Sequence, residues 1–225
     1  MGKRRRYIII VAGGKGERMG ADKPKQFLEI AGKPILRRTM ERFISFDPTA
    51  SMTVVLPSAW KNWWKEYCTS SAFRCKFSIV SGGITRFHSV QNALKMVPSG
   101  ALVAIHDGVR PLVSDDLLKR IFEAAEELPA VIPAVPAVDS LRILDCAGGS
   151  SPVDRSRYVA VQTPQIFHSE VLKEAYGKAY SPSFTDDASV VEAAGFPVTL
   201  VPGERTNLKI TTFEDIRLAG LLTED

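Results

Sequence analysis

The stretch Tyr7-Ile8-Ile9-Ile10-Val11-Ala12-Gly13-Gly14-Lys15-Gly16 decides how this chain folds. Its apolar, β-branched half predicts a buried strand, because such residues suit a sheet that is covered on both faces. The glycines that follow predict a loop whose backbone N–H groups approach a ligand without obstruction from a Cβ atom. A strand that leads into such a loop is typical of α/β folds that bind ligands at the carboxyl edge of a parallel sheet.

Beyond this stretch, short apolar runs alternate with helical patterns. This alternation predicts an α/β fold, with a Rossmann-like, mostly parallel sheet flanked by helices. We expect further strands at 52–56, 77–80, 102–105, 131–135 and 198–201. We expect helices at 34–46, from about 58, at 85–96, after 114, at 169–179, at 186–194 and after 212. Ser114 is a predicted helix N-cap, and Thr212-x-x-Asp215 resembles a capping box.

One segment, residues 136–158, breaks the alternation. Its polar and apolar residues alternate from Asp139 to Asp145, and Gly148-Gly149-Ser150 then predicts a turn. We therefore expect a β-hairpin arm at about 136–158 that protrudes from the α/β body. With no internal repeat in the sequence, residues 1–225 are expected to form a single domain that includes this arm.

Composition narrows the functional classes. The 225 residues carry a formal net charge of +4, which suits polyanionic small molecules but is too small to indicate nucleic acid by itself. Three cysteines without a C-x-x-C pair and three distant histidines indicate neither a disulfide framework nor a zinc site. The apolar run after the basic N-terminus is too short for a secretion signal, so we expect a cytoplasmic protein without a membrane anchor.

The glycine-rich loop predicts a phosphate cradle. Arg18 and Lys25 place two cations near its backbone N–H groups. Two known templates fail, because Gly14-Lys15 lacks the following Ser or Thr of a Walker A loop and Met19 replaces a glycine of the dinucleotide fingerprint. A glycine-rich turn with incidental surface cations is the alternative.

Three other clusters contain candidate residues. Gly83 and Ser89 follow an expected strand and suit close contact with a flat base. Asp107 follows a buried strand, where it could hold a divalent cation or a ribose hydroxyl, and Lys209 adds a cation late in the chain. Each of these features alone is more often structural than functional. The stripe formed by Trp60, Trp63 and Trp64 is interpreted as core packing rather than a base-stacking platform.

Together, the motifs resemble the methylerythritol phosphate cytidylyltransferase family of non-mevalonate isoprenoid synthesis, along nearly the whole chain. They occur in the order of that family: the glycine loop with Arg18, Pro24-Lys25-Gln26-Phe27, Gly82-Gly83-x-x-Arg86-x-x-Ser89-Val90, His106-Asp107-x-x-Arg110-Pro111, Val153-Asp154-Arg155, Gln162-Thr163-Pro164-Gln165, Thr185-Asp186-Asp187-Ala188-Ser189 and Asn207-Leu208-Lys209-Ile210-Thr211. So many ordered matches are highly specific.

The resemblance implies transfer of CMP from CTP to 2-C-methyl-D-erythritol 4-phosphate, with Mg²⁺ or another divalent cation. It also implies a homodimer, in which the arm embraces the second subunit, and no membrane or nucleic-acid partner. The implied nucleotide-binding residues are Ala12, Gly13, Gly14, Gly83, Ser89 and Asp107, the last also near the metal. The implied catalytic residues are Arg18 and Lys25, which stabilise the transition state, and Arg155 and Lys209, which position the acceptor phosphate. The implied acceptor pocket consists of Arg110, Ser140, Thr163 and Thr185.

Two departures and three alternatives accompany this interpretation. Ser140 stands where threonine is usual in the family, and Ile84 stands where an acid is common. The nearest alternative is a ribitol 5-phosphate cytidylyltransferase, although Val153-Asp154-Arg155 looks more like the methylerythritol group. A non-catalytic nucleotide-binding regulator and a nucleic-acid-binding module are the others. A phosphate monoester is already largely ionised at neutral pH, so the implied reaction needs charge neutralisation rather than a general base.

Overall fold

The computed structural model describes residues 4–14, 23–146 and 148–223. A mixed sheet of eight strands forms its centre, in the order β10-β7-β11-β6-β1-β4-β5, with β12 paired to β7. Strand β1 (Arg5–Val11) lies between β4 (Ser51–Leu56) and β6 (Ala101–Asp107), and β5 (Ser78–Ser81) lies beyond β4. These four strands are parallel, so the stretch that opens the chain occupies the parallel half of the sheet as predicted.

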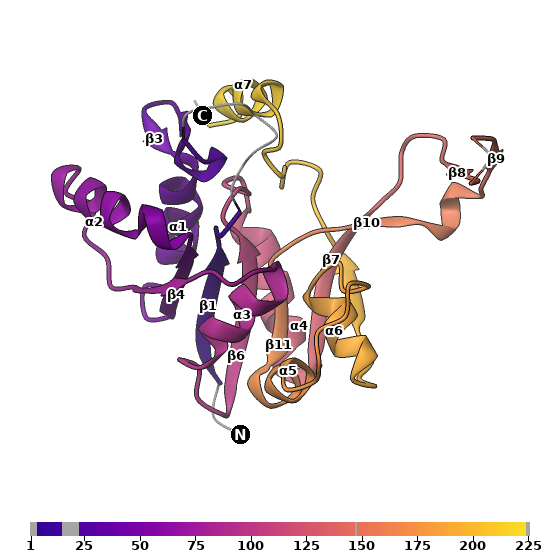
Figure 1. Cartoon of the computed structure of the whole chain (residues 1–225), viewed down its shortest axis with the longest axis horizontal. Helices are drawn as coiled ribbons and strands as arrows, with labels where there is room; N and C mark the ends of the chain where they lie inside the picture. Colours follow the sequence, from indigo (N-terminus) through magenta and orange to yellow (C-terminus); the bar gives the residue numbers. More distant parts are fainter. Residues whose placement is uncertain (1–3, 15–22, 147, 224–225) are drawn as a thin grey trace.

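Helices cover both faces of the sheet (Figure 1). Alternate residues of β1 point to opposite faces, so Ile8 and Ile10 pack in one apolar cluster and Ile9 packs in the other. The first cluster includes residues of α1 (Ile35–Phe46), α2 (Lys61–Ser70) and α4 (Asp115–Glu127). The second includes residues of α3 (Arg86–Leu94), α5 (Ser169–Tyr176) and α6 (Asp187–Ala193). This two-sided burial confirms the predicted α/β class.

The other half of the sheet contains the predicted strands at 131–135 and 198–201, and also two strands that the sequence did not predict, at 159–161 and 165–168. Strand β11 (Gln165–His168) is antiparallel to both β6 and β7 (Ala130–Pro136), and β10 (Val159–Val161) is antiparallel to β7. Strand β12 (Thr199–Pro202) is parallel to β7. With three and four residues, β10 and β11 are too short for a clear periodic pattern.

Several predicted boundaries also needed correction. Pro34 was expected in the first turn of a helix, but it belongs to β3 (Lys33–Pro34), which pairs with β2 (Glu29–Ile30), and it is the N-cap of α1. The helix expected from Ser58 begins as a 3₁₀ turn, η3 (Ser58–Trp60), before α2. The Ser114 cap of α4 is confirmed, as is the Thr212–Asp215 capping box of α7 (Phe213–Leu221).

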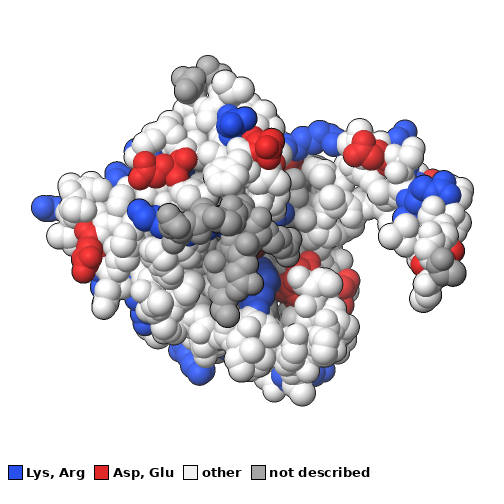
Figure 2. Space-filling model, turned by 45° about the horizontal axis from the view of Figure 1, so that its top comes forward, with Lys and Arg blue, Asp and Glu red and all other residues white. Residues whose placement is uncertain are grey.

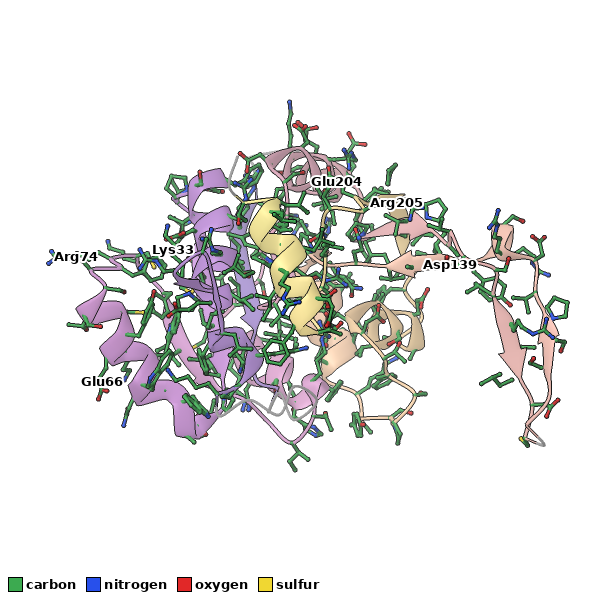
Figure 3. The ribbon with its side chains drawn as sticks, turned by 90° about the horizontal axis from the view of Figure 1, so that it is seen from above. Lys33, Glu66, Arg74, Asp139, Glu204 and Arg205 are labelled. Atoms are coloured by element: carbon green, nitrogen blue, oxygen red, sulfur yellow. The ribbon has the colours of Figure 1, made fainter. Side chains whose placement is uncertain are left out.

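The predicted arm is present as a hairpin outside the main sheet. Strands β8 (Arg142–Leu144) and β9 (Ser150–Pro152) pair antiparallel and form a sheet of their own. Figures 1 and 2 show the arm extending away from the body, with open space beneath its tip. Figure 3 places Asp139 at its base, where Arg205 donates a hydrogen bond to the carbonyl of Pro136. A role of this arm in dimerisation stays a prediction.

Within the described ranges, no helix is long and apolar enough to cross a membrane.

Candidate active site

The site is built at the carboxyl edge of the parallel strands, where the loops after β1, β5 and β6 meet. Three backbone hydrogen bonds join them to neighbouring strands: Ala12 N–H donates to Val55 O (3.0 Å), Gly82 N–H to Leu56 O (2.8 Å) and Gly108 N–H to Val11 O (2.9 Å). The parallel register therefore brings together three segments that are far apart in the sequence. They contain most of the residues that the resemblance assigned to nucleotide binding.

Close packing explains why glycine stands at position 83, whereas Gly13 has room for a small side chain. A Cβ atom on Gly13 would lie 3.4 Å from the hydroxyl oxygen of Ser89. A Cβ atom on Gly83 would overlap Cβ of His88 and lie 2.9 Å from the carbonyl carbon of that residue. The backbone at Gly83 can therefore keep this close approach to α3 only without a side chain.

Ser89 holds this loop together as well as facing the site. Its hydroxyl accepts a hydrogen bond from Gly83 N–H (3.0 Å) and donates one to Thr85 O (2.9 Å). A hydroxyl has one proton and two lone pairs, so the remaining lone pair can accept one further bond, for example from the amino group of a base. Ile84, beside this loop, is 95% exposed and contributes no polar group to it.

A single buried carboxylate, Asp107, collects three cations at the end of β6. Oδ2 of Asp107 lies 3.0 Å from Lys209 Nζ and 3.3 Å from Arg110 Nε, and its Oδ1 lies 3.9 Å from Arg86 Nε. Burial by itself would raise the pKa of Asp107, but the three cations outweigh it and hold the pKa well below its usual range. The carboxylate is therefore ionised. Because Arg86 also pairs with the buried Asp187, three cations face two carboxylates and one positive charge is left over. Such a centre attracts a further anion.

Arg110 and Thr163 fix the position of Asp107. The guanidinium of Arg110 bonds Asp107 and also donates to the carbonyl of Asn207 (2.8 Å), two residues before Lys209. The hydroxyl of Thr163 accepts from Asp107 N–H (3.0 Å). Asn207 in turn donates to Thr163 O (2.8 Å), so the three segments close into one network.

His106 completes this network from inside the core. Its Nε2 lies 3.0 Å from Arg110 O, and its Nδ1 lies 3.2 Å from Thr163 Oγ1. Since a carbonyl can only accept, Nε2 is the donor, and Nδ1 accepts from Thr163. Burial lowers the pKa of His106 to about 4, so the ring is neutral at physiological pH. A neutral ring with both nitrogens engaged is a structural support rather than a general base.

Arg86 is a residue of the site to which the sequence analysis assigned no role. It follows the Thr85 N-cap at the start of α3, and its Nη2 lies 2.6 Å from Oδ2 of Asp187 in the first turn of α6. Asp187 is fully buried, and its Oδ1 accepts a hydrogen bond from Tyr176 (2.6 Å). Arg86 thus links Asp107 to the segment that contains Thr185. The signals were its place in the Gly82-Gly83-x-x-Arg86 motif and the consecutive acids after Thr185.

The predicted acceptor residues divide between the body and the arm. Arg110 and Thr163 lie in the Asp107 network, and Thr185 precedes α6, where its N–H donates to Ser189 Oγ (3.1 Å). Ser140 and Arg155 lie on the arm, where Arg155 belongs to the 3₁₀ turn η4 (Arg155–Arg157) and donates to Val138 O. In the described residues of the single chain, the recorded bonds of Arg155 stay within the arm. The body network and the arm residues are therefore two separate halves.

Of the two cations predicted for the glycine loop, Lys25 is described, and Arg18 lies outside the described residues. Lys25 is the first residue of the 3₁₀ turn η2 (Lys25–Phe27). The next residue, Gln26, is buried and donates from its side-chain amide to Ala12 O (2.7 Å) and Gly14 O (3.2 Å). Gln26 therefore joins the segment of Lys25 to the backbone that follows β1. The sequence analysis quoted Gln26 in a motif but gave it no role.

The aromatic stripe packs beside this turn. Phe27 lies between Trp60, Trp63 and Trp64, with ring centroids 5.2, 4.8 and 5.9 Å away. Trp64 is fully buried, and the other two indoles pack against the same core cluster. The interpretation of this stripe as core packing is confirmed.

The donor set for a divalent cation is small. Among the residues that the structure describes, no group of three or more His, Cys, Asp or Glu side chains converges. Asp107, paired in register with Val11 at the end of β1, places a carboxylate at the same sheet edge. This fits Mg²⁺, because the ion commonly uses one or two carboxylates together with substrate phosphates. Cys68 and Cys75 are half-buried, and burial raises the pKa of each thiol to about 11, so neither is a reactive thiolate.

Comparisons with known proteins agree with this geometry. The family described as 2-C-methyl-D-erythritol 4-phosphate cytidylyltransferase matches residues 7–224. Relatives of that name from Bacteroides thetaiotaomicron and Porphyromonas gingivalis are each 50% identical to this chain, over 215 and 221 residues. These alignments cover 96% and 98% of this chain, respectively, and 98% of each relative.

Solved structures agree as well. The crystal structure of 4-diphosphocytidyl-2C-methyl-D-erythritol synthase from Anaerococcus prevotii superposes with a TM-score of 0.84 at 27% identity and full coverage of both chains. The 2-C-methyl-D-erythritol 4-phosphate cytidylyltransferase from Thermus thermophilus superposes with a TM-score of 0.74 at 31% identity, covering 96% of this chain and 98% of its own. This chain therefore belongs to the family of 2-C-methyl-D-erythritol 4-phosphate cytidylyltransferases.

Proposed function

We propose that this enzyme transfers CMP from CTP to 2-C-methyl-D-erythritol 4-phosphate, giving 4-diphosphocytidyl-2-C-methyl-D-erythritol and pyrophosphate. The family match along residues 7–224 carries the proposal. The excess of cations around Asp107 supports it, because the reaction brings two anions together. The ribitol 5-phosphate alternative is not favoured, since the relatives share the methylerythritol name.

The proposed reaction depends on the charges of the two phosphate groups that react. A phosphate monoester of the acceptor is largely ionised at neutral pH, so one of its oxygens can attack the α-phosphorus of CTP without a general base. A bond forms from that oxygen to phosphorus, while the bond to the β-phosphate oxygen breaks and pyrophosphate leaves in line. The protein's task is to neutralise the negative charge that gathers at the α-phosphate. We assign this task to Arg18 and Lys25.

The nucleotide half of the site consists of Ala12, Gly13, Gly14, Gly83, Ser89 and Asp107. In this proposal the three glycines allow the backbone to approach CTP, and Ser89 offers its free lone pair to the base. Asp107 would contact the ribose and, with the CTP phosphates, hold Mg²⁺ or another divalent cation. Such an ion supplies charge neutralisation at the phosphates when it is bound.

The acceptor half draws on two parts of the fold. Arg110, Thr163 and Thr185 would line the pocket from the body, with Lys209 positioning the acceptor phosphate. Ser140 and Arg155 would complete the pocket from an arm. Because the arm extends away from its own body, we propose that it reaches the site of a second subunit in a homodimer (Figure 1). Action on small molecules rather than nucleic acid fits the modest net charge, and the cytoplasmic location stays a prediction.

A turnover screen tests the proposed function. CTP, ATP and GTP are each paired with methylerythritol phosphate and ribitol 5-phosphate, and pyrophosphate release is measured. We expect turnover with CTP and methylerythritol phosphate, and a kcat/KM for ATP or GTP lower by about three orders of magnitude, because a site that hydrogen-bonds its base rejects bases that leave those groups unpaired. A higher kcat/KM for ribitol 5-phosphate would replace the acceptor, and comparable rates with ATP would overturn the assignment of the base pocket.

A further inference from the structure

The two ends of the glycine-rich segment are joined by one side chain, that of Gln26. Ala12 and Gly14 stand at the entrance of this segment, directly after β1, and Lys25 stands at its exit in the turn η2. The amide nitrogen of Gln26 lies 2.7 Å from Ala12 O and 3.2 Å from Gly14 O. A glutamine amide has two N–H donors, so the entrance carbonyls use both of them.

The opposite side of the turn is fixed by packing. The ring of Phe27 is buried between the indoles of Trp60, Trp63 and Trp64. Nζ of Lys23 lies 5.1 Å from the ring centroid of Trp63, which adds a cation–π contact at the start of the turn. Both residues that follow Lys25 therefore have buried side chains with defined partners.

The geometry of a 3₁₀ turn transmits this restraint to Lys25. With three residues per turn, successive side chains point about 120° apart. Once Gln26 points to the entrance carbonyls and Phe27 points into the aromatic cluster, only one direction remains for the Cα–Cβ bond of Lys25. The backbone hydrogen bonds from Phe27 N–H to Pro24 O (2.9 Å) and from Leu28 N–H to Lys25 O (3.1 Å) keep the turn closed.

We propose that Gln26 is a positioning residue for the reaction, which sets the direction of Lys25 relative to the backbone of Ala12 and Gly14. This inference rests on the proposed role of Lys25. In this proposal Gln26 contacts neither substrate, because Ala12 O and Gly14 O use its N–H donors. Its two hydrogen bonds make the nucleotide-binding backbone and the catalytic cation one rigid unit, so that CTP phosphates held by the former meet the latter at the correct distance.

A double-mutant cycle with Gln26→Met and Lys25→Ala tests the proposal in the full-length enzyme. Methionine keeps the length and the burial but has no N–H donor. Gln26→Met alone should lower kcat at least tenfold, since a misplacement of about 1 Å at a reacting centre can cost about a hundredfold. In the Lys25→Ala background, the same change should lower kcat by less than about threefold, because residues that act as a unit are non-additive. A full tenfold effect in both backgrounds would overturn the proposal.

Gln91→Met is the matched control. Gln91 also donates its side-chain amide to a backbone carbonyl, that of Tyr176 (2.9 Å), but it has no assigned part in the site. Its kcat should stay within about twofold of the wild type, so a loss as large as that of Gln26→Met would overturn the proposal.

If Gln26→Met does not fold, as judged by its thermal transition, a second variant replaces it. Trp63→Leu loosens the turn from its other side, and its effect on kcat must depend on Lys25 in the same way. If Lys25→Ala alone keeps the wild-type rate, the proposed role of Lys25 is wrong. If Lys25→Ala lowers the rate but the effects of the two substitutions are additive, only the positioning role of Gln26 is wrong.

Discussion

The Asp107 network and the arm are two regions with opposite physical character. Around Asp107, buried polar groups are paired with one another across segments as distant as Arg86 and Lys209. On the arm, apolar side chains face solvent, and Leu144 is 79% exposed. The groups of the network find their partners within one chain. In contrast, covering exposed leucine and isoleucine side chains with another surface would lower the free energy of the protein. This difference supports the proposal that a second subunit covers the arm.

Lys25→Ala tests the half of the active site that lies on the body, and of the substitutions proposed here it should have the largest effect. We expect kcat to fall about a hundredfold or more, the scale of losing one transition-state charge contact. Arg18→Ala should behave similarly. Steady-state kinetics with CTP and methylerythritol phosphate provide the measurement, and Lys65→Ala, an exposed lysine of α2, serves as the control. Near-normal kcat in both loop variants, with the fold intact, would remove the phosphate cradle from the account.

Arg155→Ala tests the half of the active site that lies on the arm. We expect kcat/KM for the acceptor to fall about thirtyfold, since a hydrogen bond to a charged group contributes about 2 kcal/mol. Arg157 occupies the same 3₁₀ turn, so Arg157→Ala is a matched control for charge and location. Equal losses in both variants would point to a general electrostatic effect of the arm rather than a contact of Arg155 with the acceptor phosphate.

Leu144→Ser should have the smallest effect and should act on assembly. Covering one leucine contributes about 1.5–3 kcal/mol, so its loss should weaken dimerisation about tenfold or more. Sedimentation velocity at several concentrations measures the dissociation constant. Leu221→Ser in α7 removes an equally apolar side chain, 69% exposed, that lies outside the arm. A dimer disrupted by Leu221→Ser but not by Leu144→Ser would place the interface away from the arm.

The sequence predicted the parts of the fold that have strong local signals. The strand from Tyr7 and its glycine loop were clear because apolar periodicity and backbone freedom act over a few residues. The arm was clear because the pattern of residues 139–145 breaks the α/β rhythm and leads to the turn residues Gly148-Gly149-Ser150. In contrast, β10 and β11 are defined by antiparallel pairing with β7, a long-range contact that leaves little trace in three or four residues.

The candidate site divides in the same way. Asp107, Arg110 and Lys209 could be named because each stands in a recognisable motif, and the structure brings them into contact. Arg86 and Gln26 were part of quoted motifs but received no role, because their function depends on partners in distant segments. The bonds from Arg86 to Asp187 and from Gln26 to Ala12 exist only once the sheet has formed.

Subunit mixing tests most directly the central claim that each active site combines the body of one subunit with the arm of the other. At acceptor concentrations well below KM, Lys25→Ala and Arg155→Ala homodimers should keep only about 1% and about 3% of wild-type activity, as expected above. When they are mixed equally and allowed to exchange, half of the dimers are mixed, and each mixed dimer has one intact site if the two residues act across the interface. The account predicts recovery toward about a quarter of wild-type activity, from this random pairing. No recovery, with exchange confirmed independently, would contradict it and place both residues in the site of one chain.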